Sequence, residues 1–272
     1  MKKKGEKKGE LSANLKTLFS SIVIPASLVV AILIFIIILG NPTNFQGNDH
    51  NNAPLPGNYF GMIYKGGFIV PILMSLLIIV LSFSIERYLT IRKAKGSGAV
   101  VGFVRNIKRL LAEHKIDEAM NACDKQKGSV ANVIRSVLER YVALEKDTDL
   151  TKDQKLLSIQ KEVEEATSLE LPSLEQNLVI LATISSIATL MGLLGTVIGM
   201  IRAFSALANA GAPDSVALAT GISEALINTA FGIGTAALAI ISYNVFTTQI
   251  DKLTYSIDEA GFSIVQTYAA QH

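Results

Sequence analysis

The hydrophobic residues of this chain are concentrated in four long runs separated by polar stretches. A helix needs about 20 mainly apolar residues to cross a bilayer, and four segments meet this requirement: 22–39, 66–85, 178–201 and 215–246. Half of the 272 residues are hydrophobic, and a soluble core would not gather them into such runs. The pattern therefore predicts an all-α integral membrane protein with four transmembrane helices.

The first run follows a lysine-rich tail and could be mistaken for a secretory signal peptide. Its apolar stretch, however, is longer than the usual signal core, and the "NPTNFQG" that follows is not an A-x-A-like cleavage site. We therefore interpret residues 22–39 as a helix that is retained in the membrane.

Basic residues predict the orientation of the four helices, because loops rich in Lys and Arg stay in the cytoplasm. Lysines fill the tail, and four basic residues open the segment after the second run, whereas the short connections hold only Lys65 and Arg202. Both termini and the central segment are therefore expected to be cytoplasmic. The expected layout is a basic tail (1–21), transmembrane helix (22–39), external linker (40–65), transmembrane helix (66–85), cytoplasmic helical domain (86–177), transmembrane helix (178–201), external loop (202–214), transmembrane helix (215–246) and cytoplasmic C-terminal helix (247–272).

The central segment 86–177 places its apolar residues at helical spacing. From Thr151, a helix cap, the pattern predicts a helix that continues toward the third run as a stalk. Nearly balanced charges indicate solvated helix faces rather than nucleic-acid binding. The sequence holds no phosphate loop and no nucleophile elbow, which argues against an enzyme. Cys123 is expected to be a small buried side chain, and the three histidines are scattered, so neither a metal nor another cofactor is predicted.

The fourth run contains Glu224, an acid that is costly to place in lipid. At 100° per residue, a polar stripe forms on one face of this helix; its members are Thr220, Glu224, Asn228, Phe231, Thr235 and Ser242. The third run has a comparable stripe with Ser185, Thr189, Gly192 and Thr196, and the small residues Gly192, Gly195 and Gly199 would let another helix approach closely. These faces are expected to meet water or protein rather than lipid.

Glu224 lies about nine residues inside its run, or roughly 13 Å from the outer end. This depth predicts a place near the middle of the bilayer, beyond the reach of Arg202 and Lys65 at the outer boundary. Desolvation disfavours the ionised carboxylate, which suits a group that takes up and releases a proton. The alternative is a buried carboxyl that only forms hydrogen bonds with nearby hydroxyls.

Three stretches of the sequence carry a family resemblance: "GLLGTVIGMIRAF" (192–204), "ATGISEALINTAFGIGTAALAIISYNVF" (219–246) and "SIERYLTIRKA" (84–94). Together they resemble the ExbB/TolQ branch of the MotA/TolQ/ExbB proton-channel family. The resemblance implies a bacterial inner-membrane subunit that forms a homo-pentamer around a dimer of an ExbD/TolR-like partner. Proton flow would then energise a TonB/TolA-like protein that spans the periplasm.

Three residues match positions to which the family assigns the proton path: Glu224, Thr196 and Thr229. Ideal geometry places Thr229 about 140° from Glu224, so we expect it to face Thr196 across a helix–helix seam. Thr189 stands where the family usually has a proline, and Asn228 where it has a small apolar residue. Both are added to the candidate proton path for their polarity.

The helix at 22–39 is a further departure, because typical members of the ExbB/TolQ branch have three spans. A MotA-type flagellar stator subunit also has four and remains an alternative. A rotor-ring subunit is disfavoured by the long segment 86–177, and a membrane scaffold without ion flow is the third alternative. The sequence leaves open uptake or envelope maintenance, and proton or sodium ion.

Overall fold

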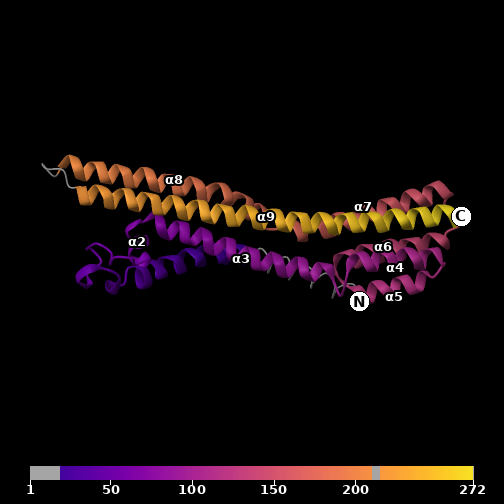
Figure 1. The fold of residues 1–272 in the computed structure, drawn as a ribbon. Helices are drawn as coiled ribbons and strands as arrows, with labels where there is room; N and C mark the ends of the chain where they lie inside the picture. The colour runs from indigo at the N-terminus through magenta and orange to yellow at the C-terminus, as the bar shows by residue number, and fades with distance from the viewer. Residues whose placement is uncertain (1–18, 210–214, 272) are drawn as a thin grey trace. The chain divides into compact units, whose positions relative to one another are not determined.

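The computed structural model describes residues 19–209 and 215–271, and these are almost entirely helical (Figure 1). Four of the described helices are long and apolar enough to cross a membrane; they lie within Phe19–Leu39, Ile69–Ala112, Lys152–Ser205 and Leu218–Ala270. The expectation of an all-helical chain with four such helices is therefore confirmed for this part of the chain. Most of the basic tail expected at 1–21, and part of the loop expected at 202–214, fall outside the described residues.

The chain divides into two compact units. The first unit holds the residues up to Ser84 together with Ile180–Tyr243, and the second holds Ile85–Val179 together with the residues from Asn244 onward. The elements that contribute to the first unit are a helix at 19–34, the π-helical turn η1 (Phe35–Leu39), the short 3-10 helices η2 (Pro42–Asn44) and η3 (Gln46–Asn48), and the helices α2 (Tyr59–Lys65), α3 (Ile69–Lys95), α8 (Leu178–Asn209) and α9 (Ser215–Gln271).

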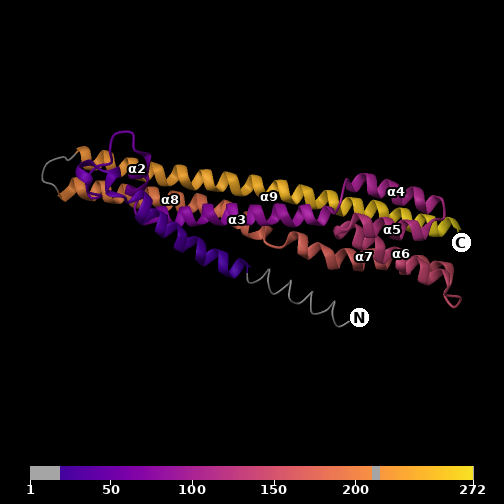
Figure 2. The same cartoon turned by 90° about the horizontal axis from the view of Figure 1, so that it is seen from below.

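The segment 40–65, expected to be an external polar linker, is folded around Asn44. The buried Asn44 amide donates to the carbonyls of Ile38 (2.8 Å) and Leu39 (3.0 Å) and so satisfies the end of η1. Tyr64 of α2 stacks on Phe35 with ring centroids 4.6 Å apart. These contacts form a clasp, defined here as residues 35–65, between the first helix and α3 (Figure 2).

Helices α8 and α9 are antiparallel neighbours that approach closely through small residues (Figures 1 and 2). A Cβ atom added at Gly199 would lie 2.9 Å from Ala225 Cβ, and one added at Gly221 would lie 2.6 Å from Ala203 Cβ. These two contacts fix the register, because they place residues near 200 of α8 level with residues near 224 of α9. Close backbone approach of this kind favours association of membrane helices.

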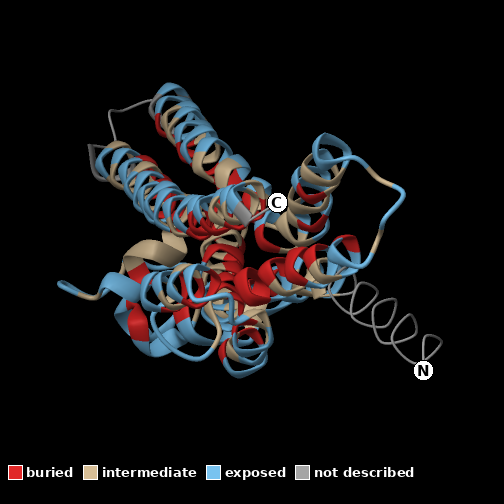
Figure 3. Ribbon diagram, turned by 90° about the vertical axis from the view of Figure 1, so that its right-hand side faces the viewer, coloured by how far each residue is buried: buried red, intermediate tan, exposed pale blue. Residues whose placement is uncertain are grey.

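The second unit contains α4 (Val100–Ala112), α5 (Ile116–Gln126), α6 (Gly128–Glu145) and α7 (Lys152–Glu175), with the ends of α3 and α9. Buried residues, red in Figure 3, lie where these helices pack together. In the core, the fully buried rings of Tyr141 and Tyr268 meet edge to face with centroids 4.8 Å apart. This geometry is the one that aromatic quadrupoles prefer.

Helix α7 begins at the expected cap but ends before α8. Thr151 forms a capping box with Gln154, which confirms the predicted start. The expected continuous stalk is wrong, because α7 ends at Glu175 and Asn177 has φ 68°. Arg87, fully buried, donates to the carbonyl of Leu174 at 3.0 Å, so one orphan carbonyl of the last turn is satisfied from outside the helix.

Candidate functional site

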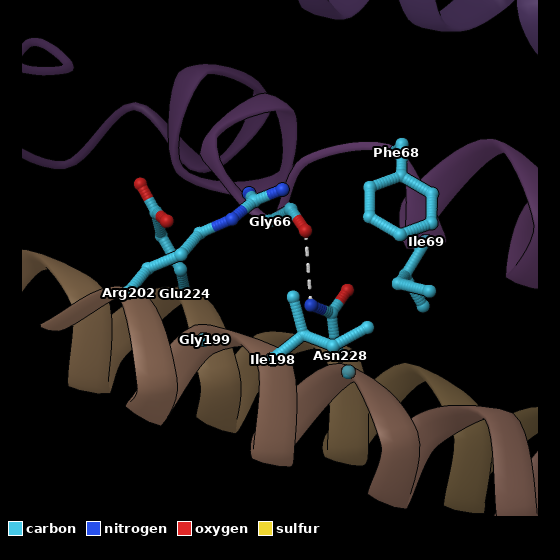
Figure 4. A pocket seen from close by; sticks show the side chains of 9 residues that line it. Gly66, Phe68, Ile69, Ile198, Gly199, Arg202, Glu224 and Asn228 are labelled. Atoms are coloured by element: carbon cyan, nitrogen blue, oxygen red, sulfur yellow. Dashed lines mark hydrogen bonds between the residues drawn. The ribbon is translucent and has the colours of Figure 1, made fainter. Parts of the chain in front are cut away.

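Glu224 lies half-buried on α9, and its side chain lines two cavities of the first unit. The larger is an open hollow of about 450 Å³, lined by residues 54–57 of the clasp and by Lys65, Thr220 and Ser223 as well as Glu224. The smaller has a volume of about 10 Å³ and is lined by the start of α3 with parts of α8 and α9 (Figure 4). Glu224 therefore lines both an open hollow and a much smaller cavity.

Two cations lie close to Glu224, contrary to the sequence-based expectation. Lys65 and Arg202 are near enough to interact electrostatically with its carboxylate, and Arg202 lines the small cavity beside it (Figure 4). The expectation was wrong because α8 continues as a helix to Asn209. The register of α8 against α9 then places Arg202 about two residues, or roughly 3 Å, from the level of Glu224.

The guanidinium of Arg202 is held over the ring of Phe68, 5.7 Å from its centroid. A cation in this position is attracted by the ring quadrupole. Arg202 also passes close to the chain just before α3, because a Cβ atom added at Gly67 would lie 3.1 Å from its Nη1 atom. The residue is therefore positioned by the connection between α2 and α3, and not only by its own helix.

Thr196 and Thr229 meet across the seam between α8 and α9. Their hydroxyl groups form a hydrogen bond with each other. Each hydroxyl also lies 3.3 Å from the carbonyl oxygen of Gly192 and 3.4 Å from that of Ala225. Since a hydroxyl both donates and accepts, the two threonines place polar groups inside a mainly apolar interface between two helices.

Asn228 is buried inside the chain, with 2% of its surface exposed. Its side chain fits against Gly195, where an added Cβ atom would lie 2.5 Å from Asn228 Cβ. Its amide Nδ2 donates to the carbonyl oxygen of Gly66 at 3.0 Å. Thr235, on the same stripe, is also 2% exposed. At these two positions the polar stripe of α9 faces protein of its own chain.

Of the remaining candidate site residues, Thr189 lies apart from Glu224, and three glycines contribute to helix packing. Thr189 is exposed, donates to the carbonyl of Ser185 at 3.3 Å, and does not join the group around Glu224. Gly192, Gly195 and Gly199 all face α9, where an added Cβ atom would come within 3.0 Å of Asn228 or Ala225 atoms. The glycines thus allow the seam that brings Thr196 to Thr229.

Sequence reasoning missed Gly66, Phe68 and Arg202 as neighbours of Glu224. When two antiparallel helices are joined by a short connection, residues at equal distances from that connection lie side by side. Arg202 and Glu224 are at similar sequence distances from residues 210–214 and should therefore lie at the same level. That signal was present in the sequence. The contribution of Gly66 was not, because it depends on the fold of the clasp.

The described residues hold no group of three or more His, Cys, Asp or Glu side chains arranged to bind a metal ion. Cys123 of α5 is buried, and desolvation raises the pKa of its thiol to about 12. A thiol with such a pKa is almost entirely protonated near neutral pH and is therefore a weak nucleophile.

The part of the chain that holds Glu224 resembles a known protein family. Residues 129–259 match the model of the MotA/TolQ/ExbB proton channel family. The matched stretch contains Thr196, Glu224 and Thr229, as well as α8 and most of α9. The family resemblance expected from the sequence is confirmed over this stretch.

Curated relatives carry the names of two systems. The Tol-Pal system protein TolQ of Pseudomonas aeruginosa is 32% identical over 124 residues, which cover 46% of this chain and 54% of that protein. TolQ of Haemophilus influenzae is 39% identical over 88 residues, covering 32% and 39%. The biopolymer transport protein ExbB of Pseudomonas putida is 36% identical over 86 residues, covering 32% and 26%. The chain thus spans about half or less of the length of these relatives.

Proposed function

We propose that this chain, whose residues 129–259 match the model of the MotA/TolQ/ExbB proton channel family, is a proton-channel subunit of an ExbB/TolQ-like motor complex. The complex would lie in a bacterial inner membrane, with both termini of the chain in the cytoplasm. It would couple the proton motive force to a TonB/TolA-like protein for outer-membrane transport or envelope maintenance. A channel family also supports the expectation that the chain is not an enzyme.

The observation that carries this proposal is that Glu224 lines two cavities. The residue borders the open hollow of about 450 Å³ and also the small cavity beside Asn228. A group that exchanges protons needs access to water on one side and a polar continuation on the other. Ionisable residues within membrane helices mark ion pathways by default.

Arg202 and Lys65 give the site its electrostatic character. Both act on the Glu224 carboxylate, so an ionised Glu224 has counter-charges within its own chain. Arrival of a proton cancels the carboxylate charge and leaves the two cations unbalanced. A change of that kind alters the local field and supplies a physical link between proton binding and a shift of helices, with the transmembrane potential adding about 2.3 kcal/mol per charge per 100 mV.

The Thr196–Thr229 pair is proposed as the next step inward from Glu224. Its hydroxyls are hydrogen-bonded to each other across the α8–α9 seam, and they can pass a hydrogen bond on in either direction. Thr189, exposed on α8 in the single chain, is proposed to face a neighbouring subunit. A homo-pentamer enclosing an ExbD/TolR-like partner would supply that neighbour.

The four candidate spans also fit the alternative of a MotA-type stator subunit. The similarity to relatives named TolQ and ExbB favours the ExbB/TolQ branch. Purification from the native membrane distinguishes the two. An ExbD/TolR-like protein is expected to co-purify, whereas a peptidoglycan-binding plug protein would identify a stator.

The test of the channel itself is Glu224→Gln, which keeps the shape of the side chain and removes its titratable proton. In vesicles with an imposed proton gradient, we expect the variant complex to lose at least about 90% of its flux. Ser75→Ala is a matched control, because Ser75 is buried in the first unit and, among the described residues, donates to the Ile72 carbonyl of its own helix. Unchanged flux in a normally assembled Glu224→Gln complex would refute the channel and favour a membrane scaffold without ion flow.

A further inference from the structure

Each of the two cavities that Glu224 lines is also lined by one basic side chain. Lys65 lines the open hollow, and Arg202 lines the small cavity. Figure 4 shows the side chains of Arg202 and Glu224 pointing from the α8–α9 pair toward the connection before α3. An ion in either cavity therefore lies near a positive charge of the same chain.

Both cations are held beside aromatic rings. Lys65 Nζ lies 5.6 Å from the centroid of the Phe45 ring and donates to the carbonyl of Asn51 at 3.0 Å. The Arg202 guanidinium lies over the ring of Phe68. An aromatic ring attracts a cation without neutralising its charge, and neither cation forms an ion pair with a carboxylate among the described residues. Both positive charges therefore act on an ion that enters the cavities.

The oxygen atoms around Glu224 would otherwise suit a sodium ion. The open hollow is lined by Thr220 and Ser223 as well as Glu224, and hard cations prefer oxygen ligands. The small cavity, of about 10 Å³, is close to the smallest that holds one water molecule, so a sodium ion there would also lose its hydration shell. The oxygen ligands alone do not distinguish sodium from a proton, and the two basic side chains supply the difference.

We propose that Lys65 and Arg202 determine the ion specificity of the site by excluding sodium from the Glu224 carboxylate. This inference rests on the function proposed above. A sodium ion is held by electrostatic attraction alone, and a unit charge about 10 Å away changes such an affinity roughly ten-fold at the effective dielectric constant of a protein. A proton is held by a covalent bond to a carboxyl oxygen, which persists beside the same charges. The site therefore stays available to protons when sodium is in large excess.

The test is the labelling of Glu224 by dicyclohexylcarbodiimide, a reagent that attacks protonated carboxyl groups in apolar surroundings. A sodium ion bound to the carboxylate would slow this reaction, which is followed by mass spectrometry of the Glu224 peptide. In the wild-type complex, we expect the labelling rate to stay within about two-fold when choline is replaced by sodium at constant pH and ionic strength. In Lys65→Gln/Arg202→Gln, we expect sodium to slow the labelling at least about ten-fold.

The matched control is Lys65→Arg/Arg202→Lys, which changes both side chains and keeps both positive charges. This variant should be as insensitive to sodium as the wild type, which separates loss of charge from a change in packing. Lys93→Gln removes an exposed charge of the second unit and should also have no effect. Each single glutamine variant should gain part of the sodium protection, so the proposal stays testable if the double variant fails to assemble.

Three outcomes would overturn the proposal. They are sodium protection in the wild type, equal protection in the charge-conserving control, and no protection in any of the glutamine variants. Labelling requires no ion flow, so it is independent of channel activity. A wild-type complex with sodium-independent labelling and no proton flux in vesicles would refute the channel alone. Proton flux together with sodium-protected labelling of the wild type would refute the specificity alone.

Discussion

Gly195 of α8 packs against the side chain of Asn228 of α9, and Gly195→Ala should force the two helices apart. The added Cβ atom would lie 2.5 Å from Asn228 Cβ and 2.9 Å from Asn228 Cγ. Ordinary van der Waals contact begins at about 3.4 Å, so a displacement of about 0.9 Å is required. Because Asn228 also donates to Gly66 O, the displacement strains a buried hydrogen bond as well as the helix packing.

The expected loss of stability follows from three contributions. Overpacking of a buried site costs about 1–3 kcal/mol, and a weakened buried hydrogen bond adds about 1 kcal/mol. Alanine is favoured over glycine within a helix by about 1 kcal/mol, which offsets part of this. The net destabilisation should be about 1–3 kcal/mol.

The measurement is unfolding of the purified protein in lipid nanodiscs, with two matched glycine-to-alanine controls. An alanine Cβ would meet nothing within 4 Å at Gly234 of α9 or at Gly102 of α4, so these substitutions report only the helix preference. They should be neutral or stabilising by up to about 1 kcal/mol. If Gly195→Ala behaves like the controls, the close approach inferred at this seam is incorrect.

Three further predictions concern the second unit. Arg87→Met should destabilise the protein by about 1–3 kcal/mol in denaturant unfolding, because it leaves the buried Leu174 carbonyl without its donor and removes the partner of the partly exposed Glu86. An unchanged midpoint would contradict this. Tyr141→Ala should cost about 3–5 kcal/mol and increase protease sensitivity of the second unit, since it empties the site beside Tyr268, whereas Tyr141→Phe should retain most of the packing. Cys123, with a thiol pKa of about 12, should react with maleimide at pH 8 at least about a hundred-fold more slowly than a free cysteine. The reaction should become faster as the pH rises toward 12. Rapid labelling of the folded protein would show that the thiol is accessible.

The sequence predicted the long helices well because a bilayer imposes a length and an apolar composition that can be counted. Thr151 was also found, since a cap and its partner three residues later form a local pattern. The clasp could not be found in this way. The fold of the clasp depends on the hydrogen bond from Asn44 to the end of η1 and on the packing of Tyr64 against Phe35. These residues are not related by the repeat of a helix or of a strand, so a periodic pattern cannot reveal their contacts.

For the candidate site, periodicity identified the stripe but not its surroundings. Glu224 and Asn228 share a face by simple geometry, and the 140° offset of Thr229 pointed toward the α8–α9 seam. Arg202 was placed outside the membrane helix because a hydropathy window ends at the first charge. The helix itself ends at Asn209, since backbone hydrogen bonding continues past a single arginine.

The clasp also has a consequence for the order in which the chain is assembled during synthesis. Its contacts join residues close in sequence, such as Asn58 to Asn44 at a separation of 14, whereas Asn228 reaches Gly66 across 162 residues. Local contacts form early because little chain entropy is lost in closing them. We therefore expect the clasp to fold before the last helix is synthesised, so that the Gly66 carbonyl is already in place when Asn228 reaches it.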